Sequence, residues 1–149
     1  MQWFDEDEIQ HELYVHLLWS TAGQKSLIPQ SVEQGLCDYL RDLALTAKCH
    51  LIGGCVSADH IQMVIKFSPE TILSDLIQDF KLASTWWLRT HFHALRDFDW
   101  QKSDFSFTVD FEEVGELVEN TKNSKSFEQE IYYLLDQNKI HYDPLEVLE

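Results

Sequence analysis

The sequence predicts an α+β fold in which a four-stranded antiparallel sheet carries two long helices on one face. Two short apolar runs, residues 51–56 and 61–67, flank Ser57-Ala58-Asp59 and predict a β-hairpin at the centre of the chain. Apolar side chains recur at threes and fours in residues 32–48 and again in residues 71–91, which predicts two amphipathic helices. The order strand, helix, strand, strand, helix, strand then favours a ferredoxin-like or RNA-recognition-motif-like sandwich.

The first strand is predicted within residues 9–20, which are rich in β-branched and aromatic residues. His16 and Trp19 fit either a place near a site or packing, and their apolar neighbours favour packing. Pro29 then breaks the chain, and Ser31 is predicted to be the N-cap of the first helix, residues 32–48, because serine caps helices well.

In the second helix Trp86 and Trp87 are adjacent, so at most one of them can point into the core. The other is a candidate contact for a partner. Residues 105–109 alternate as a strand, and helices are predicted at residues 111–120 and 127–138. Because no repeat and no long linker divides the chain, residues 1–149 are predicted to form one domain.

The second arm of the hairpin places polar side chains on a strand that otherwise reads as buried. His60, Gln62 and Val64 share one face, because side chains alternate along a strand. One interpretation is a site on an open face of the sheet. The other, which the spacing favours, is a histidine that is hydrogen-bonded to Asp59 in the turn.

Composition narrows the function classes. The 149 residues are 44% hydrophobic and include 11 Lys and Arg against 26 Asp and Glu, a net charge of −15. This charge repels phosphate and disfavours nucleic-acid binding over most of the surface. The three cysteines lack CxxC spacing, no apolar run is long enough for a membrane span, and the acidic start differs from a signal peptide. We therefore expect a cytoplasmic protein that does not enter a membrane.

Short motifs in register along nearly the whole chain carry a family resemblance. They are Tyr14-Val-His-Leu-Leu-Trp-Ser-Thr21, Leu51-Ile-Gly-Gly54, Asp59-His-Ile-Gln-Met-Val-Ile65, Ile72-Leu-Ser-Asp-Leu-Ile77, Lys81-Leu-Ala-Ser-Thr-Trp-Trp87, Trp100-Gln101, Phe105-Ser-Phe-Thr-Val109, Ser126-Phe-Glu-Gln-Glu130 and Ile140-His-Tyr-Asp143. With them the chain resembles the single-tyrosine transposases of small bacterial insertion sequences, the IS200-like group that includes the repeat-associated tyrosine transposases. The resemblance implies dimers that recognise hairpin DNA and cut single strands through a covalent tyrosine-phosphate bond.

The resemblance also implies a site, and this chain departs from it. The family's His-hydrophobic-His motif holds Mg²⁺ or Mn²⁺, and a helix supplies the nucleophilic tyrosine with a third ligand four residues later. Here the two motif positions are His60 and Gln62. Aligning the helix on residues 118–120 and 126–130 puts Leu117 at the nucleophile position and Thr121 at the third-ligand position. The resemblance therefore implies a fold that is kept and a reaction that is lost.

A second alignment stays open, because Tyr133 and Gln137 also stand four apart on a predicted helix. It would make Tyr133 the nucleophile of an active single-strand DNA transposase. This alignment loses the match of the C-terminal motifs, so we favour the first alignment.

Two classes of function follow from these patterns. In the first, the protein is a catalytically inactive transposase relative that still binds DNA hairpins or single strands through Lys81, Trp86 and Arg89. In the second, it is an acidic interaction module that engages a basic protein, as a nucleic-acid mimic or as the partner of an active relative. We expect a homodimer that exchanges the helices in residues 111–138, and no cofactor, with Mg²⁺ or Mn²⁺ only if activity is retained.

Overall fold

The computed structural model describes residues 12–123 and 125–138. The elements follow the predicted order closely. They are β1 (Tyr14–Ser20), α1 (Gln30–Thr46), β2 (His50–Val56), β3 (His60–Lys66), α2 (Leu73–His91), β4 (Phe105–Val109), α3 (Val114–Asn120) and α4 (Phe127–Gln137). In the described residues the strands form one sheet in the order β2-β3-β1-β4, and every neighbouring pair is antiparallel. The α+β prediction is confirmed.

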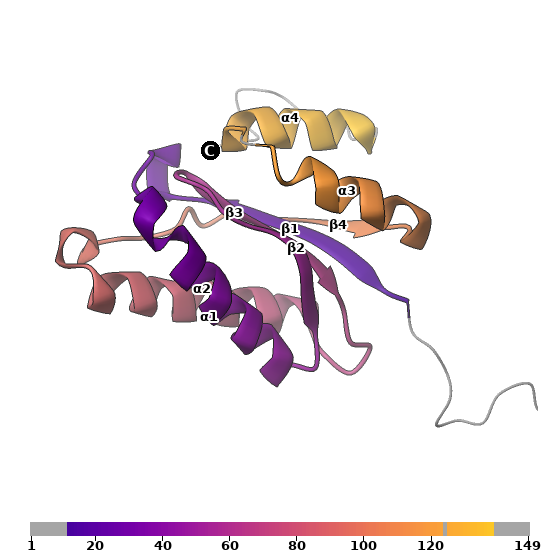
Figure 1. Ribbon diagram of the computed structural model, residues 1–149, viewed down its shortest axis with the longest axis horizontal. Helices are drawn as coiled ribbons and strands as arrows, with labels where there is room; N and C mark the ends of the chain where they lie inside the picture. Colours follow the sequence, from indigo (N-terminus) through magenta and orange to yellow (C-terminus); the bar gives the residue numbers. More distant parts are fainter. Residues whose placement is uncertain (1–11, 124, 139–149) are drawn as a thin grey trace, which may run out of the picture.

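The main core lies between the sheet and the two long helices. In Figure 1, α1 and α2 lie together below the sheet. Alternate residues of β1 and β3 point toward them, and Leu17, Trp19, Ile61 and Met63 are completely buried. Phe80 of α2 stacks on Trp19 with ring centroids 6.3 Å apart. This apolar packing supplies most of the burial that holds the sheet to the helices.

The opposite face of the sheet is covered by α3 and α4, which lie above it in Figure 1. The expectation that this face is open was wrong. The last helix has an apolar stripe that must be buried, and it packs on Leu18 of β1 with Phe105 and Phe107 of β4. The stripe consists of Phe127, Ile131, Leu134 and Leu135.

The start of α4 is well defined, because Ser126 forms a capping box with Gln129. The N-cap prediction for the first helix was wrong: α1 begins one residue before Ser31, and Pro29 is its N-cap. The predicted helix at residues 111–120 opens with a 3₁₀ turn, Phe111–Glu113, before α3.

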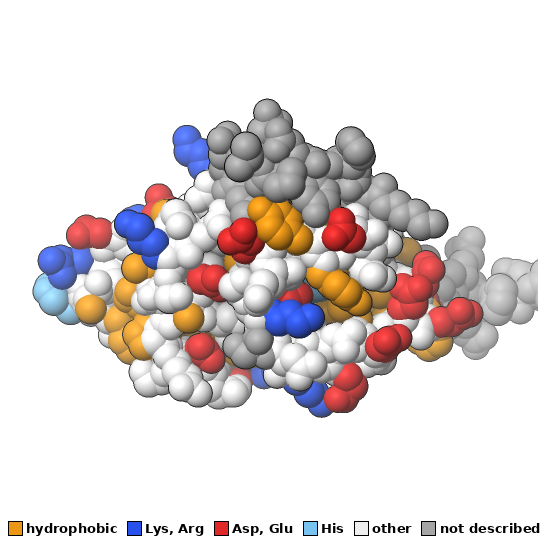
Figure 2. Space-filling view, turned by 90° about the horizontal axis from the view of Figure 1, so that it is seen from above, with side chains coloured by type: hydrophobic (Ala, Val, Ile, Leu, Met, Phe, Trp, Pro, Cys, Tyr) orange, Lys and Arg blue, Asp and Glu red, His pale blue; other side chains and the backbone are white. Residues whose placement is uncertain are grey.

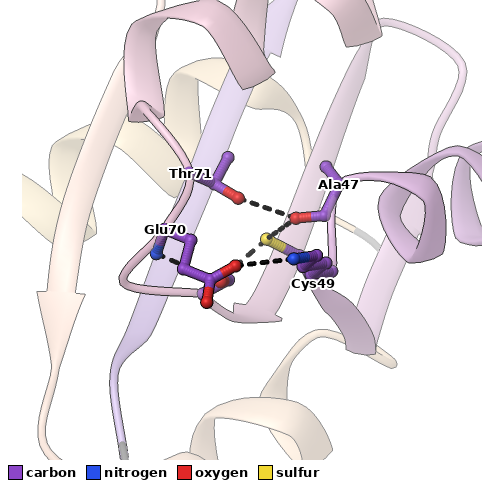
Figure 3. A network of polar contacts seen from close by, with 6 residues as sticks. Ala47, Cys49, Glu70 and Thr71 are labelled. Carbon is purple, nitrogen blue, oxygen red and sulfur yellow. Dashed lines mark hydrogen bonds and ion pairs between the residues drawn. The ribbon is translucent and has the colours of Figure 1, made fainter.

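Polar contacts join the end of α1 to the segment that follows β3, as Figure 3 shows. The Thr71 hydroxyl donates to the Ala47 carbonyl at 2.7 Å, and Lys48 pairs with Glu70 at 2.7 Å. This network lies at the Lys66 end of β3, the end opposite His60. None of the described helices combines the length and the apolar character that a membrane crossing requires.

Candidate functional site

The polar side chains of the covered sheet face are the candidate site. Ser20 pairs with His60 across β1 and β3, and Gln62 faces Leu18, two pairs along the same ladder. His16 lies on this face as well, because it is separated from Leu18 and Ser20 by even intervals. All four polar side chains are at most 4% exposed. Such burial is costly unless the polar atoms find partners.

His60 is bound to the turn that precedes it. Its Nδ1 lies 2.6 Å from Asp59 Oδ1, which confirms the favoured interpretation of this histidine. The other carboxylate oxygen of Asp59 accepts from the Phe127 backbone N–H at 3.3 Å, and the His60 and Phe127 rings lie 5.8 Å apart. Burial would raise the pKa of Asp59, but the bonds from His60 and Phe127 lower it below its ordinary value. Asp59 therefore links His60 to the first turn of α4.

Gln62 is engaged by a second histidine. Its Oε1 lies 3.1 Å from His16 Nε2. Burial lowers the pKa of His16 to about 4, against a smaller upward effect of the bond to Gln62, so His16 is neutral at pH 7. His16 Nδ1 and His60 Nε2 are buried and have no hydrogen-bond partner among residues 12–123 and 125–138. The apolar neighbours of His16 predicted packing for this residue. The register of β1 against β3, which brings His16 beside Gln62, would have been needed to predict their contact.

A buried carboxyl group was also missed by sequence reasoning. Glu130 of α4 is 7% exposed, and burial raises the pKa of its side chain while Lys125 and His60 act in the opposite direction. Glu130 follows Phe127 by three residues, so the two side chains lie on the same side of α4. Because Phe127 packs on His60, Glu130 also faces the sheet. Its signal was the apolar spacing of α4, which puts position 130 beside buried Ile131 and Leu134.

The resemblance assigns the nucleophile to Leu117, which lies in α3, and the third ligand to Thr121, which is the C-cap of that helix. Thr121 follows Leu117 by one helical turn, with its N–H donating to the Leu117 carbonyl at 3.0 Å. Thr121 and Gln62 line one cavity of about 320 Å³. A Cβ on Gly53 of β2 would lie 2.7 Å from the Val118 side chain, so this glycine lets α3 approach the sheet closely.

These residues do not fit a Mg²⁺ or Mn²⁺ site. Such ions prefer several oxygen ligands, carboxylates above all. The donors here are one imidazole nitrogen of His60, the Gln62 amide that already meets His16, and the Thr121 hydroxyl, which donates to the Val118 carbonyl. Nowhere in residues 12–123 and 125–138 do three His, Cys, Asp or Glu side chains stand where they could hold a metal.

Tyr133 and Gln137 lie on α4 and line a second cavity, of about 280 Å³, together with His16 and Leu117. Tyr133 is 47% exposed, and the Lys125 ammonium lies 5.0 Å from the centre of its ring. The structure thus brings Tyr133 to the same cavity as Leu117. Gln62 and Thr121 line the other cavity, and His60 lines neither.

The predicted contact residues lie on the other side of the sheet, on α2. Lys81, Trp86 and Arg89 line one groove of about 1010 Å³. The Lys81 ammonium binds the carbonyls of residues 101–103 and the Asp104 carboxylate, and Arg89 Nε donates to the Phe98 carbonyl at 2.7 Å. Trp86 is 58% exposed, whereas Trp87 packs on Tyr39, as expected of two adjacent tryptophans. The two cations thus hold a loop beside the groove.

The family model of the IS200-like transposases matches residues 9–124. The ISDra2 transposase TnpA of Deinococcus radiodurans is 28% identical over 74 residues, half of this chain and 53% of that protein. The chain thus spans about half the length of that curated relative. The crystal structure of a protein from Deinococcus radiodurans R1, provisionally assigned as a transposase, superposes with a TM-score of 0.65 at 23% identity, covering 81% of this chain and 98% of that one.

Because the family model covers most of the sequence, this chain belongs to the IS200-like transposase family and is related to the enzymes of DNA transposition. The structural likeness confirms the fold. The motif at residues 140–143 lies outside the described residues.

Proposed function

We propose that this chain is a catalytically silent member of its family. The observation that carries the proposal is Leu117 on α3: an aliphatic side chain has no atom that can attack phosphorus. The family match ends at residue 124, so it spans Leu117 and Thr121 and stops before Tyr133. The shared cavity of Thr121 and Gln62 supports the alignment that assigns these two positions to metal ligands.

The surroundings of the site support the same proposal. His60 and Gln62, the family's metal-ligand positions, are bound to Asp59 and His16 within the chain. We expect the protein to work without a cofactor, with Mg²⁺ or Mn²⁺ only if activity is retained.

The test is a cleavage assay with labelled hairpin DNA that carries a single-stranded flank, in Mn²⁺ or Mg²⁺. The wild-type protein should form neither a cleaved product nor a covalent protein-DNA adduct. An adduct that persists in Tyr133→Phe would overturn the silent assignment, and one that is lost in Tyr133→Phe would make Tyr133 the nucleophile. A variant that restores the family pattern, Leu117→Tyr with Gln62→His and Thr121→Gln, is the matched comparison for any gain of adduct.

Retention of nucleic-acid binding is the second part of the proposal. The exposed ring of Trp86 lines the α2 groove and offers a surface on which a base can stack, beside Lys81 and Arg89, which also bind the neighbouring loop. A gel-shift titration at low salt should show binding of hairpin DNA that Trp86→Ala weakens about tenfold. No shift at low salt removes this part and leaves catalytic silence untouched. The protein is proposed to be cytoplasmic and to act as a homodimer with exchanged C-terminal helices.

An acidic interaction module is the alternative function, and the net charge of −15 favours it. Figure 2 shows acidic side chains on the face that carries α3 and α4. A surface of this sign attracts basic proteins and repels DNA. Binding of a basic protein partner with no binding of hairpin DNA would select this alternative.

A further inference from the structure

A cavity between α3, α4 and the sheet remains unexplained by the proposed function. It is the 280 Å³ cavity introduced above, and we call it the α3–α4 cavity. The side chains that matter to its chemistry are His16, Glu113, Glu116, Leu117, Tyr133 and Gln137. Its volume is at the lower limit of small-molecule sites, which suits a group of the size of a lysine or arginine side chain and excludes a nucleotide.

The lining of the α3–α4 cavity includes several side chains that can accept hydrogen bonds. Glu113, the N-cap of α3, and Glu116, in the first turn of that helix, both line it, as does Gln137 of α4. His16 also lines the cavity; it is 1% exposed, and its Nδ1 has no partner in the part of the chain that the structure describes. In the tautomer whose Nε2–H donates to Gln62 Oε1, Nδ1 carries no proton and is a hydrogen-bond acceptor. A buried acceptor without a donor is costly, and a ligand that donates would relieve it.

The charge of the cavity selects the sign of that ligand. Two carboxylates repel a phosphate, so the lining opposes the anion that a tyrosine transposase would hold beside its nucleophile. Tyr133 also lines the cavity, and the Lys125 ammonium lies 5.0 Å from the centre of its ring, so this ring already contacts one cation. A bare metal ion does not fit, because no three metal-ligating side chains meet in the described part of the chain.

We propose that the α3–α4 cavity binds an alkylammonium or guanidinium group through Glu113, Glu116 and the unpartnered nitrogen of His16. The inference goes beyond catalytic silence and does not require it. Two sources offer this chemistry, a free polyamine and the Lys or Arg side chain of another protein. The net charge of −15 raises the local concentration of either one.

Isothermal titration calorimetry on the full chain at physiological salt tests the proposal with putrescine, agmatine and a glycine-flanked single-lysine peptide as probes. At least one probe should bind at a single site. Glu113→Gln with Glu116→Gln should weaken it at least tenfold, and Leu117→Trp should abolish it by filling the cavity without changing the charge. The control, Glu112→Gln with Glu119→Gln, removes the same charge from side chains that do not line the cavity and should retain binding.

The outcomes separate specific binding from general attraction to an acidic protein. Equal weakening in the control pair, or binding that survives Leu117→Trp, would overturn the proposal, as would the absence of binding by every probe. Binding of the diamine or agmatine alone identifies a free amine as the ligand, and binding of the peptide alone identifies a protein side chain. Circular dichroism melting curves confirm that each variant is folded. The cleavage assay is independent, so failure here leaves the silent assignment in place.

Discussion

The two faces of the β1–β3 pair are equally buried, but only one of them is entirely apolar. Toward α1 and α2, Leu17, Trp19 and Met63 are completely buried in an apolar cluster. Toward α3 and α4, His60 and Gln62 are also buried, and His60 Nε2 finds no partner among the described residues. A buried polar atom without a partner costs roughly 1–3 kcal/mol. The first face therefore stabilises the fold, and the second retains a polar arrangement at the expense of stability.

Matched leucine truncations should show the largest difference between the two faces. Leu40 of α1 is completely buried in the larger cluster, and Leu135 of α4 is 4% exposed in the smaller one. Each change to alanine should cost about 2–5 kcal/mol where the surroundings cannot relax, so Leu40→Ala should be near the upper end. Leu135→Ala should cost less, since α4 can shift toward the gap.

Urea denaturation and hydrogen exchange together measure this difference. Leu40→Ala should lower the midpoint of the whole cooperative transition, and Leu135→Ala should accelerate exchange mainly in α4. Equal losses of global stability in both variants would mean that the two faces unfold as one unit, and the contrast between them would not hold.

The polar face should also make stability depend on pH through His16. Its folded-state pKa is about 4 and its ordinary value is 6.5, so the unfolded chain binds the additional proton between these values. The free energy of unfolding should therefore fall by about 3 kcal/mol as the pH is lowered from 6.5 to 4. Thermal or urea unfolding at half-unit pH steps measures the slope.

His16→Gln is the control, because an amide can still donate to Gln62 and does not titrate. The difference between the two proteins isolates His16 from its neighbours. Asp59, whose pKa is lowered, loses its stabilising contribution only below its ordinary value of 3.8. Glu130, whose pKa is raised, makes stability fall as the pH rises above 4.5, the opposite direction. An unchanged slope in His16→Gln would show that His16 is not the titrating group.

The sequence predicts the apolar face well because its signal is local. Helical spacing in residues 32–48 and 71–91 and alternation in the strands specify which side chains are buried, and the sheet order follows from chain connectivity. The interpretation of His60 as a partner of Asp59 was likewise within reach, since the two are adjacent. Local patterns sufficed wherever the interacting residues are close in sequence.

The site on the other face depends on contacts between residues that are distant in sequence. His16 and Gln62 are 46 positions apart, and the Phe127 N–H that binds Asp59 is 68 positions away. Only the pairing of β1 with β3 and the packing of α4 bring them together. The same packing covers the face that was expected to be open. The amphipathic pattern of a short helix indicates that its apolar stripe must be buried, but it does not indicate which surface the stripe packs against.

The smallest expected effect concerns the N-terminal cap of α4, one of the helices that cover this face of the sheet. The Ser126 hydroxyl accepts from the Gln129 N–H at 3.2 Å, and the Gln129 side-chain oxygen accepts from the Ser126 N–H at 3.1 Å. Ser126→Ala should cost about 1 kcal/mol, seen as faster hydrogen exchange in the first turn of α4. Ser31→Ala is the control: Ser31 lies inside α1 and caps nothing, so the change should alter stability by less than about 0.5 kcal/mol. If both variants behave alike, the cap contributes nothing, and α4 is held by Asp59 and its apolar stripe alone.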